Sequence, residues 1–216
     1  MQKDPLKESV ETGLQALELP LPGRAVSQLL DYLRLLEKWN KVYNLTAVRQ
    51  PGEMVCRHLM DSLSVTPWLR GKSVADVGTG GGLPGVPLAI ARPDLCFTLI
   101  DSSGKKTRFL KHALGKLALD NVSVAQCRVE DYDGAPAFDT VISRAFSTVG
   151  DFVLLAGHLC RPGGRLLAMK GVAPVSDSAQ LPEGWSVEEI HKLEVPGLNA
   201  ERHLLLVSQL PPGETE

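Results

Sequence analysis

Apolar side chains in the first seventy residues recur at helical spacing. Between Val26 and Tyr43 they fall at steps of three and four, at Leu29, Leu30, Leu33, Leu36 and Trp39. This spacing gathers them on one side of a helix, so it predicts an amphipathic helix that packs one face inward. A second helix is predicted over residues 53–63, which read EMVCRHLMDSL. We therefore expect residues 1–70 to form a helical N-terminal extension.

The period changes after Gly71, where short β-branched or apolar runs alternate with helical patterns. The predicted strands are Ser73–Val77, Cys96–Asp101, Val122–Gln126, Phe138–Ser143 and Arg165–Lys170, and the predicted helices are Pro84–Ala91, Lys105–Leu117, Val149–Leu159 and roughly Val175–Leu181. Strand–helix alternation of this kind predicts an α/β fold whose mostly parallel sheet is covered on both faces.

Two strand-like runs close the chain, WSVEEIHKLEVP at 185–196 and ERHLLLVSQL at 201–210. The loop between them is too short for a helical crossover, so the runs are predicted to pair as an antiparallel hairpin. We expect residues 71–210 to form one domain. Residues 211–216, which begin with Pro-Pro-Gly, are expected to be a flexible tail.

Composition limits the class of protein. A chain of 216 residues with 44% hydrophobic content can bury one substantial core. Its four cysteines form no Cys-x-x-Cys pair, and no apolar run approaches the ~20 residues of a membrane span. We expect a soluble, cytoplasmic protein without a structural metal. The net charge is −2, but each end of the chain carries −2, which leaves +2 on residues 23–210.

The segment SVADVGTGGGLPGVPLAIARPDLCFTLID, residues 73–101, holds the main chemical signal. The glycines at 78, 80 and 82 follow the first predicted strand, where they allow a tight turn and close approach of a ligand to the backbone. In a parallel α/β sheet the ligand lies beyond the carboxyl ends of the strands, next to the point where strand order reverses. The spacing Gly80-x-Gly82-x-x-Gly85 also matches the dinucleotide fingerprint.

Asp76 helps to decide whether the glycine loop binds a dinucleotide or S-adenosylmethionine. A carboxylate at the strand end repels a pyrophosphate, but it attracts the amino group of a ligand, directly or through water. S-adenosylmethionine has an amino group, a sulfonium and no phosphate. The pattern Asp76-x-Gly78-x-Gly80-x-Gly82 is therefore better explained by S-adenosylmethionine than by a dinucleotide. Asp101 ends the second predicted strand, where it can accept hydrogen bonds from ribose hydroxyls, or alternatively cap the next helix.

Several motifs together resemble the RsmG family, also called glucose-inhibited division protein B. They are WNKVYNLTAV, RHLMDSL, DVGTGGGLPGVPLAI, DSSGKKTRFL, ISRAF, MKG and ERHLLLV, in this order between Trp39 and about Val207. The resemblance implies a class I S-adenosylmethionine-dependent methyltransferase fold with a helical N-terminal extension. It also implies methylation of guanine N7 in the 530-loop region of 16S ribosomal RNA, with this RNA or the small ribosomal subunit as partner.

The resemblance further assigns cofactor contacts. It places Gly78 and Leu83 beside the methionine end of S-adenosylmethionine, Val129 and Glu130 beside the adenine, and Arg144 in the cofactor pocket. Together with the residues expected from the glycine loop and the end of the second strand, the expected cofactor-binding residues are Asp76, Gly78, Gly80, Gly82, Leu83, Asp101, Val129, Glu130 and Arg144.

The residues after the fourth predicted strand agree with N7 chemistry. Methyltransferases that act on the exocyclic amines of nucleobases carry an Asn/Asp-Pro-Pro-aromatic loop there, whereas this chain has Ser143-Arg144-Ala145-Phe146. None of its cysteines follows that strand, so a cysteine nucleophile for cytosine C5 is not expected. Guanine N7 already presents a lone pair and needs no general base, so catalysis would rest on positioning and exclusion of water. Arg144 is the candidate catalytic residue, and its target is left open among a phosphate, the target base and the cofactor carboxylate.

Basic residues form the candidate RNA surface. The segment GKKTRFLKHALGK gives a local charge of +3 over residues 101–120. The candidates are Lys105, Lys106, Arg108, Lys116, Lys170, Arg202 and His203. His58 and Asp61 lie three apart on a predicted helix, but with no third ligand a metal site is not expected.

Two other classes of function stay open at this stage. A nicotinamide-dependent oxidoreductase would have to tolerate Asp76 beside a pyrophosphate. A non-catalytic RNA-binding assembly factor would keep the pocket without transferring a methyl group. We expect the protein to be a monomer.

Overall fold

The computed structural model describes residues 4–134, 137–172 and 181–210. The predicted flexible tail at 211–216 lies outside these ranges, and so does the predicted helix at 175–181 apart from Leu181. No helix among the described residues is long and apolar enough to cross a membrane.

The N-terminal region is helical, and it contains one helix that the apolar spacing did not predict. Helix α1 (Pro5–Ala16) begins at Asp4, whose side chain accepts a hydrogen bond from the Leu6 amide at 3.0 Å. An aspartate followed by proline is a common helix start, so the signal was present. Helix α2 (Gly23–Tyr43) buries Leu29, Leu30, Leu33 and Leu36 as expected.

The predicted helix over residues 53–63 forms with an unusual centre. Its first turn is α3 (Pro51–Met54), its middle is a π-helix (Val55–Met60), and its last turn is α4 (Asp61–Leu63). π-helical turns are rare and often occur at functional sites. This one places residues 57, 58 and 61 on the wall of the larger cavity described below.

The sheet has seven strands in the order β3-β2-β1-β4-β5-β7-β6. The strands are β1 (Ser73–Val77), β2 (Cys96–Ile100), β3 (Val122–Ala125), β4 (Phe138–Ser143), β5 (Cys160–Lys170), β6 (Trp185–Lys192) and β7 (His203–Gln209). The first five are parallel, and β7 pairs antiparallel with both β5 and β6. The predicted parallel sheet and C-terminal hairpin are therefore confirmed. Strand β5 begins five residues before the predicted Arg165, because an irregularity in its pairing with β4 lengthens it.

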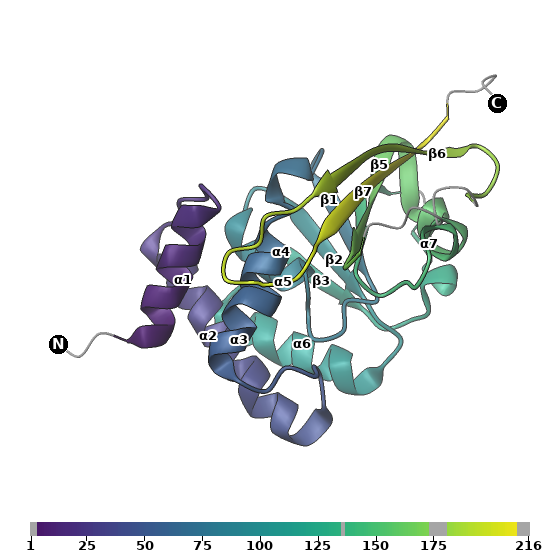
Figure 1. Ribbon diagram of the computed structural model, residues 1–216. Coiled ribbons are helices and arrows are strands. Elements are labelled where there is room, and N and C mark those ends of the chain that lie inside the picture. The colour runs from purple at the N-terminus through teal and green to yellow at the C-terminus, as the bar shows by residue number, and fades with distance from the viewer. Residues whose placement is uncertain (1–3, 135–136, 173–180, 211–216) are drawn as a thin grey trace.

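Helices cover both faces of this sheet. They are α5 (Gly85–Ala91), α6 (Gly104–Leu117) and α7 (Val149–Ala156), and α7 continues as a 3₁₀ turn (Gly157–Leu159). Figure 1 shows α7 on the other side of the sheet from α2 and α6. Apolar side chains of α1 to α6 form one core with one sheet face, and those of α7 form a second core with the other face. The N-terminal helices thus share a core with the sheet; the division near residue 70 stays a prediction.

Candidate active site

The glycine loop leaves β1 at the point where strand order reverses, since β1 lies between β2 and β4. Gly78, Gly80 and Gly82 all have left-handed backbone angles, with φ of 66°, 60° and 96°. A Cβ added at Gly78 would lie 2.6 Å from the Cβ of Ala145, so a larger side chain would close the space between β1 and β4. From α2, the Tyr32 hydroxyl donates to the Gly81 carbonyl at 2.7 Å and so ties the N-terminal helices to the loop.

Asp76 lies beneath this loop rather than on its outer surface. It has no exposed surface, and its Oδ2 accepts hydrogen bonds from the Thr79 hydroxyl at 2.6 Å and the Gly85 amide at 2.7 Å. Burial raises the pKa of Asp76 to about 6, although both hydrogen bonds oppose the shift. Oδ2 of Asp76 is thus bound within the loop, and contact of this side chain with the cofactor, directly or through water, stays a prediction. Asp76 shapes the loop, and its Oδ1 has no partner among the described residues.

Two cavities flank the loop. The larger, of about 460 Å³, is lined by the loop, the π-helix, the residues after α2 and the ends of β4 and β5. The smaller, of about 350 Å³, lies over the ends of β1 and β2. Both are lined by Gly78 and Ala145, so they meet just beyond the carboxyl ends of β1 and β4. Together they form an elongated site across the carboxyl ends of the strands.

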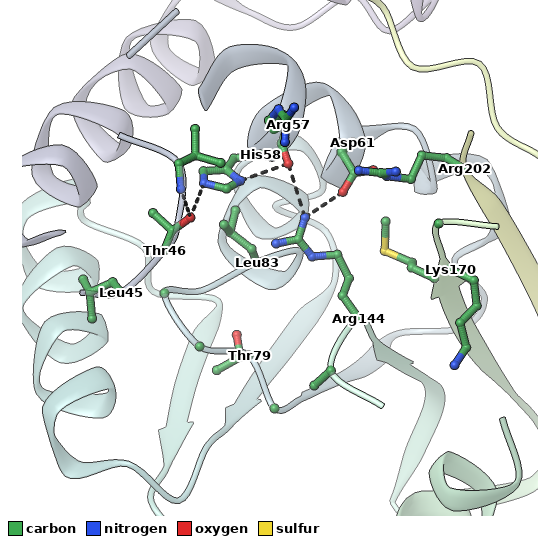
Figure 2. Close-up of a pocket in the computed structure, with 17 residues that line it drawn as sticks. Leu45, Thr46, Arg57, His58, Asp61, Thr79, Leu83, Arg144, Lys170 and Arg202 are labelled. Carbon is green, nitrogen blue, oxygen red and sulfur yellow. Dashed lines mark hydrogen bonds and ion pairs between the residues drawn. The ribbon is translucent and has the colours of Figure 1, made fainter. Parts of the chain in front are cut away.

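A buried carboxylate organises the larger cavity (Figure 2). Asp61 is 3% exposed, and its two oxygens bind two different arginines. Oδ2 accepts from Nη1 of Arg144 at 2.6 Å, and Oδ1 accepts from Nε of Arg202 at 2.8 Å. Asp61 is the first residue of α4, directly after the π-helix, Arg144 lies in the loop after β4, and Arg202 directly precedes β7. The cluster carries a net charge of +1, and both guanidiniums line the cavity.

His58 lies on the same helical wall, three residues before Asp61, and its ring is neutral. Its Nδ1 lies 2.9 Å from the Arg57 carbonyl and its Nε2 lies 2.8 Å from the Thr46 hydroxyl. Because a carbonyl only accepts, Nδ1 carries the proton and Nε2 accepts from Thr46. Burial lowers the pKa of His58 to about 4, and the charge of Arg144 acts in the same direction. The Arg57 carbonyl also accepts from Arg144 at 3.5 Å, which joins the two groups (Figure 2).

The smaller cavity contains the acidic residue predicted to bind a ribose. Asp101 follows β2 directly; its Oδ2 accepts from the Gly80 amide at 2.9 Å and lies 3.4 Å from Nζ of Lys106. Its Oδ1 accepts from the Ser103 amide, so the carboxylate also forms the turn before α6. Val129 and Glu130 line the same cavity from a 3₁₀ turn.

The seven candidate RNA-binding residues differ in their exposure and in their contacts. Lys105, Arg108 and Lys116 are exposed on α6, whereas Lys106 is half-buried beside Asp101. The other three lie elsewhere. Lys170 donates to the Phe146 and Ser147 carbonyls and Arg202 binds Asp61, while His203 is 8% exposed, with its Nδ1 3.3 Å from the Gly171 carbonyl. These side chains hold the site together, and contact of Lys170, Arg202 and His203 with RNA stays a prediction.

The sequence reasoning missed the role of Asp61 and did not assign Thr46 or Met169, which also line the larger cavity. Asp61 and Arg202 are 141 positions apart, so no spacing rule joins them. The one available signal was the pair His58 and Asp61, which lie three positions apart on the predicted helix. No group of three or more His, Cys, Asp or Glu side chains suited to a metal ion occurs in the part of the chain that the structure describes.

Comparison with solved structures shows the fold. TrmN from Thermus thermophilus matches with a TM-score of 0.55 and 17% identity, covering 72% of this chain and 53% of that one. An S-adenosylmethionine-dependent O-methyltransferase from Thermotoga maritima matches with a TM-score of 0.54 and 14% identity, covering 71% and 66%. P. horikoshii TYW2, solved in complex with MeSAdo, matches with a TM-score of 0.53 and 13% identity, covering 69% and 61%. The predicted class I methyltransferase fold is confirmed.

Comparison with known sequences shows the family. A protein of Xanthomonas euvesicatoria pv. vesicatoria (strain 85-10) is 53% identical over 199 residues, which cover 92% of this chain and 93% of that protein. One from Alkalilimnicola ehrlichii is 50% identical over 205 residues, covering 95% and 93%. Both are named ribosomal RNA small subunit methyltransferase G. The GidB family model, described as rRNA small subunit methyltransferase G, matches residues 25–205, and the chain therefore belongs to this family.

Proposed function

We propose that this S-adenosylmethionine-dependent rRNA methyltransferase transfers the methyl group to N7 of a guanine in the 530-loop region of 16S rRNA. The observation that carries the proposal is the pair of cavities that meet at Gly78 and Ala145 over the ends of β1 and β4. An elongated cofactor and a target base need two adjoining spaces at this position. The family supports rRNA as the substrate class.

The residues at the site fit S-adenosylmethionine. The smaller cavity offers Asp101 for the ribose hydroxyls, with Val129 and Glu130 for the adenine. Gly78 leaves open the space that a Cβ would fill between the cavities. In the larger cavity, the guanidiniums of Arg144 and Arg202 suit a carboxylate.

The same residues argue against a dinucleotide. In a dinucleotide site the pyrophosphate binds the amides at the start of the helix that follows the glycine loop. Here the Gly85 amide, the first of α5, donates to Asp76 at 2.7 Å. The buried carboxylate thus occupies the donor that a pyrophosphate needs, which disfavours the oxidoreductase alternative.

Catalysis by this chain is proposed to rest on positioning. When bound, the cofactor supplies a methyl group activated by its sulfonium. Asp61 fixes Nη1 of Arg144, while Nε and Nη2 of that side chain bind no described residue and are free to orient the target base, its phosphate or the cofactor carboxylate. With the cofactor and the target base bound, the walls would exclude water from the reacting atoms. No proton leaves N7 in this reaction, and the neutral His58 is not required as a base.

The exposed cations of α6 are the proposed RNA contacts. Lys105, Arg108 and Lys116 lie on the solvent side of the helix, and Lys106 lies at its start beside the smaller cavity. Reversing the charge of the three exposed residues is expected to weaken RNA binding and to leave S-adenosylhomocysteine affinity nearly unchanged, with RNA affinity falling as salt rises. The proposal also includes a monomeric, cytoplasmic enzyme without a metal, which light scattering and metal analysis of purified protein test.

The product identifies the reaction. Borohydride reduction followed by aniline cleaves RNA at 7-methylguanosine, so small-subunit RNA should be cut in the 530-loop region. The cut should disappear when the gene is deleted and return with a plasmid copy. Gly78→Asp should fail to restore it, because the new side chain meets Ala145, whereas Gly23→Asp should restore it, because a Cβ there meets no atom within 4 Å.

Two results would contradict the assignment. The first is a cut that persists in the deletion strain, and the second is mass spectrometry that places the modification on another base or atom. A protein that binds the RNA but never transfers a labelled methyl group would instead be the non-catalytic assembly factor.

A further inference from the structure

An aromatic cluster links α2 to α6. The ring of Trp39 lies 5.2 Å from Tyr43, 5.5 Å from Phe109 and 5.3 Å from His112, measured between ring centroids. Phe109 is fully buried and forms the floor of the cluster, Trp39 and Tyr43 are half-buried, and His112 is exposed. The outer rings therefore retain surface that a ligand can reach.

An exposed apolar side chain borders this cluster. Val42 is 69% exposed, three residues after Trp39 and next to Tyr43 on α2. Large exposed apolar side chains are few among the described residues, so this one enlarges an unusual apolar surface. We call the surface formed by Trp39, Val42, Tyr43, Arg108, His112 and Lys116 the α2–α6 face.

The charge of α6 is entirely positive. The helix, GKKTRFLKHALGKL, contains five Lys or Arg residues and no Asp or Glu. Within the described residues, Lys105, Arg108, Lys111 and Lys116 form no ion pair, whereas Lys106 lies 3.4 Å from Asp101. Unpaired cations beside partly open aromatic rings suit a polyanion with planar bases, because phosphates attract the cations and bases stack on the rings.

The α2–α6 face reaches both cavities of the site. Helix α6 begins three residues after Asp101, which lines the smaller cavity. Helix α2 ends at Tyr43, and the loop that follows it lines the larger cavity through Leu45, Thr46 and Val48. The two helices pack side by side (Figure 1). A strand bound on this face would therefore hold its neighbouring nucleotides at the mouth of the site.

We propose that the α2–α6 face binds single-stranded RNA next to the target nucleotide, with one base stacked on Trp39 and His112 and its phosphates beside the cations of α6. The inference rests on the proposed function for the source of the RNA, but RNA binding can be measured without methyl transfer. Trp39 is thereby a substrate-binding residue as well as a packing residue.

The test compares two tryptophans that each lie against a histidine. Trp39→Leu keeps an apolar side chain and removes the stacking surface. Trp68→Leu is the matched control, because Trp68 is also half-buried and its ring lies 5.1 Å from His191, away from this face. Affinity is measured by fluorescence anisotropy for a labelled single-stranded oligoribonucleotide of the 530-loop sequence and for a duplex of equal length.

Trp39→Leu should weaken single-strand binding roughly tenfold, and the duplex should be affected little. Trp68→Leu should bind as the wild type does, and the affinity of all three proteins for S-adenosylhomocysteine should be equal. His112→Ala, a change at an exposed position, should weaken single-strand binding in the same direction even if Trp39→Leu folds poorly.

Two outcomes overturn the proposal. In the first, both Trp39→Leu and His112→Ala bind the single strand as tightly as the wild type. In the second, they lose affinity for the assembled small subunit only, so the face contacts protein. If these variants lose RNA binding while the wild type forms no 7-methylguanosine, the RNA site stands and the proposed function fails.

Discussion

Replacing Asp61 by asparagine tests whether the buried carboxylate holds two arginines in place. The carboxylate is 3% exposed and accepts charge-assisted hydrogen bonds of 2.6 and 2.8 Å from Arg144 and Arg202. An asparagine of the same shape has one acceptor oxygen, so its amino group must face the second guanidinium, donor against donor. One hydrogen bond is lost, and the acceptor of the other no longer carries a negative charge.

The expected loss of stability follows from these contacts. Hydrogen bonds to charged groups contribute ~1.5–3 kcal/mol each, and breaking a fully buried ion pair costs ~3–5 kcal/mol. The arginine side chains are 25% and 24% exposed, so water compensates in part. We expect Asp61→Asn to lower the free energy of unfolding by about 3 kcal/mol, which corresponds to a fall of roughly 6–12 °C in Tm for a chain of this size.

Urea and thermal unfolding measure this change. Asp94→Asn is the matched control, because Asp94 binds Arg92 through two hydrogen bonds but its side chain is 48% exposed. An exposed pair contributes less than about 1 kcal/mol. In a double-mutant cycle, Asp61→Asn should cost less when Arg144 is already alanine. A strictly additive cycle, or equal loss of stability in Asp61→Asn and Asp94→Asn, would refute the role given to Asp61.

Three further outcomes are expected. The pKa of His58 is about 4 in the folded protein against 6.5 when unfolded, so its contribution to stability is full above pH 6.5 and is lost as pH falls towards 4. Between these pH values the urea midpoint should therefore fall less steeply in His58→Gln than in the wild type. Asp101→Ala should weaken S-adenosylhomocysteine binding roughly ten- to a hundredfold, and calorimetry that gives an unchanged dissociation constant would exclude the ribose role. Gly78→Ala should abolish this binding, because φ is 66° and the new Cβ lies 2.6 Å from that of Ala145; wild-type affinity would show that the cavities need not join.

The order of elements and the place of the glycine loop were predictable because both depend on local pattern. The runs after Gly71 alternate between strand and helix periods, and a parallel sheet brings the carboxyl ends of β1, β2 and β4 to one edge. Asp101, the glycines and Arg144 follow those strands, so their meeting at one site required no knowledge of packing. The cofactor contacts assigned to them stay predictions.

The direction of individual side chains was not predictable. Asp76 had the right chemistry for a ligand, but the loop folds over it and uses its oxygen for Thr79 and Gly85. His203 begins a strand in which five successive residues are buried, so no alternation indicated which side chains reach solvent. Burial of a polar side chain depends on what packs over it, and that element can lie anywhere in the sequence.

Most of the local structure, the charge of α6 and the family could be predicted from the sequence, because each is encoded in neighbouring residues or in motifs of a few positions. The contacts of Asp61 with Arg144 and Arg202, and the contact of Trp39 with His112, depend on how the whole chain packs. These contacts join residues 73 to 141 positions apart. Such pairs form only when helices and strands pack their apolar faces together, and the geometry of that packing is set by the whole core rather than by any segment of the chain.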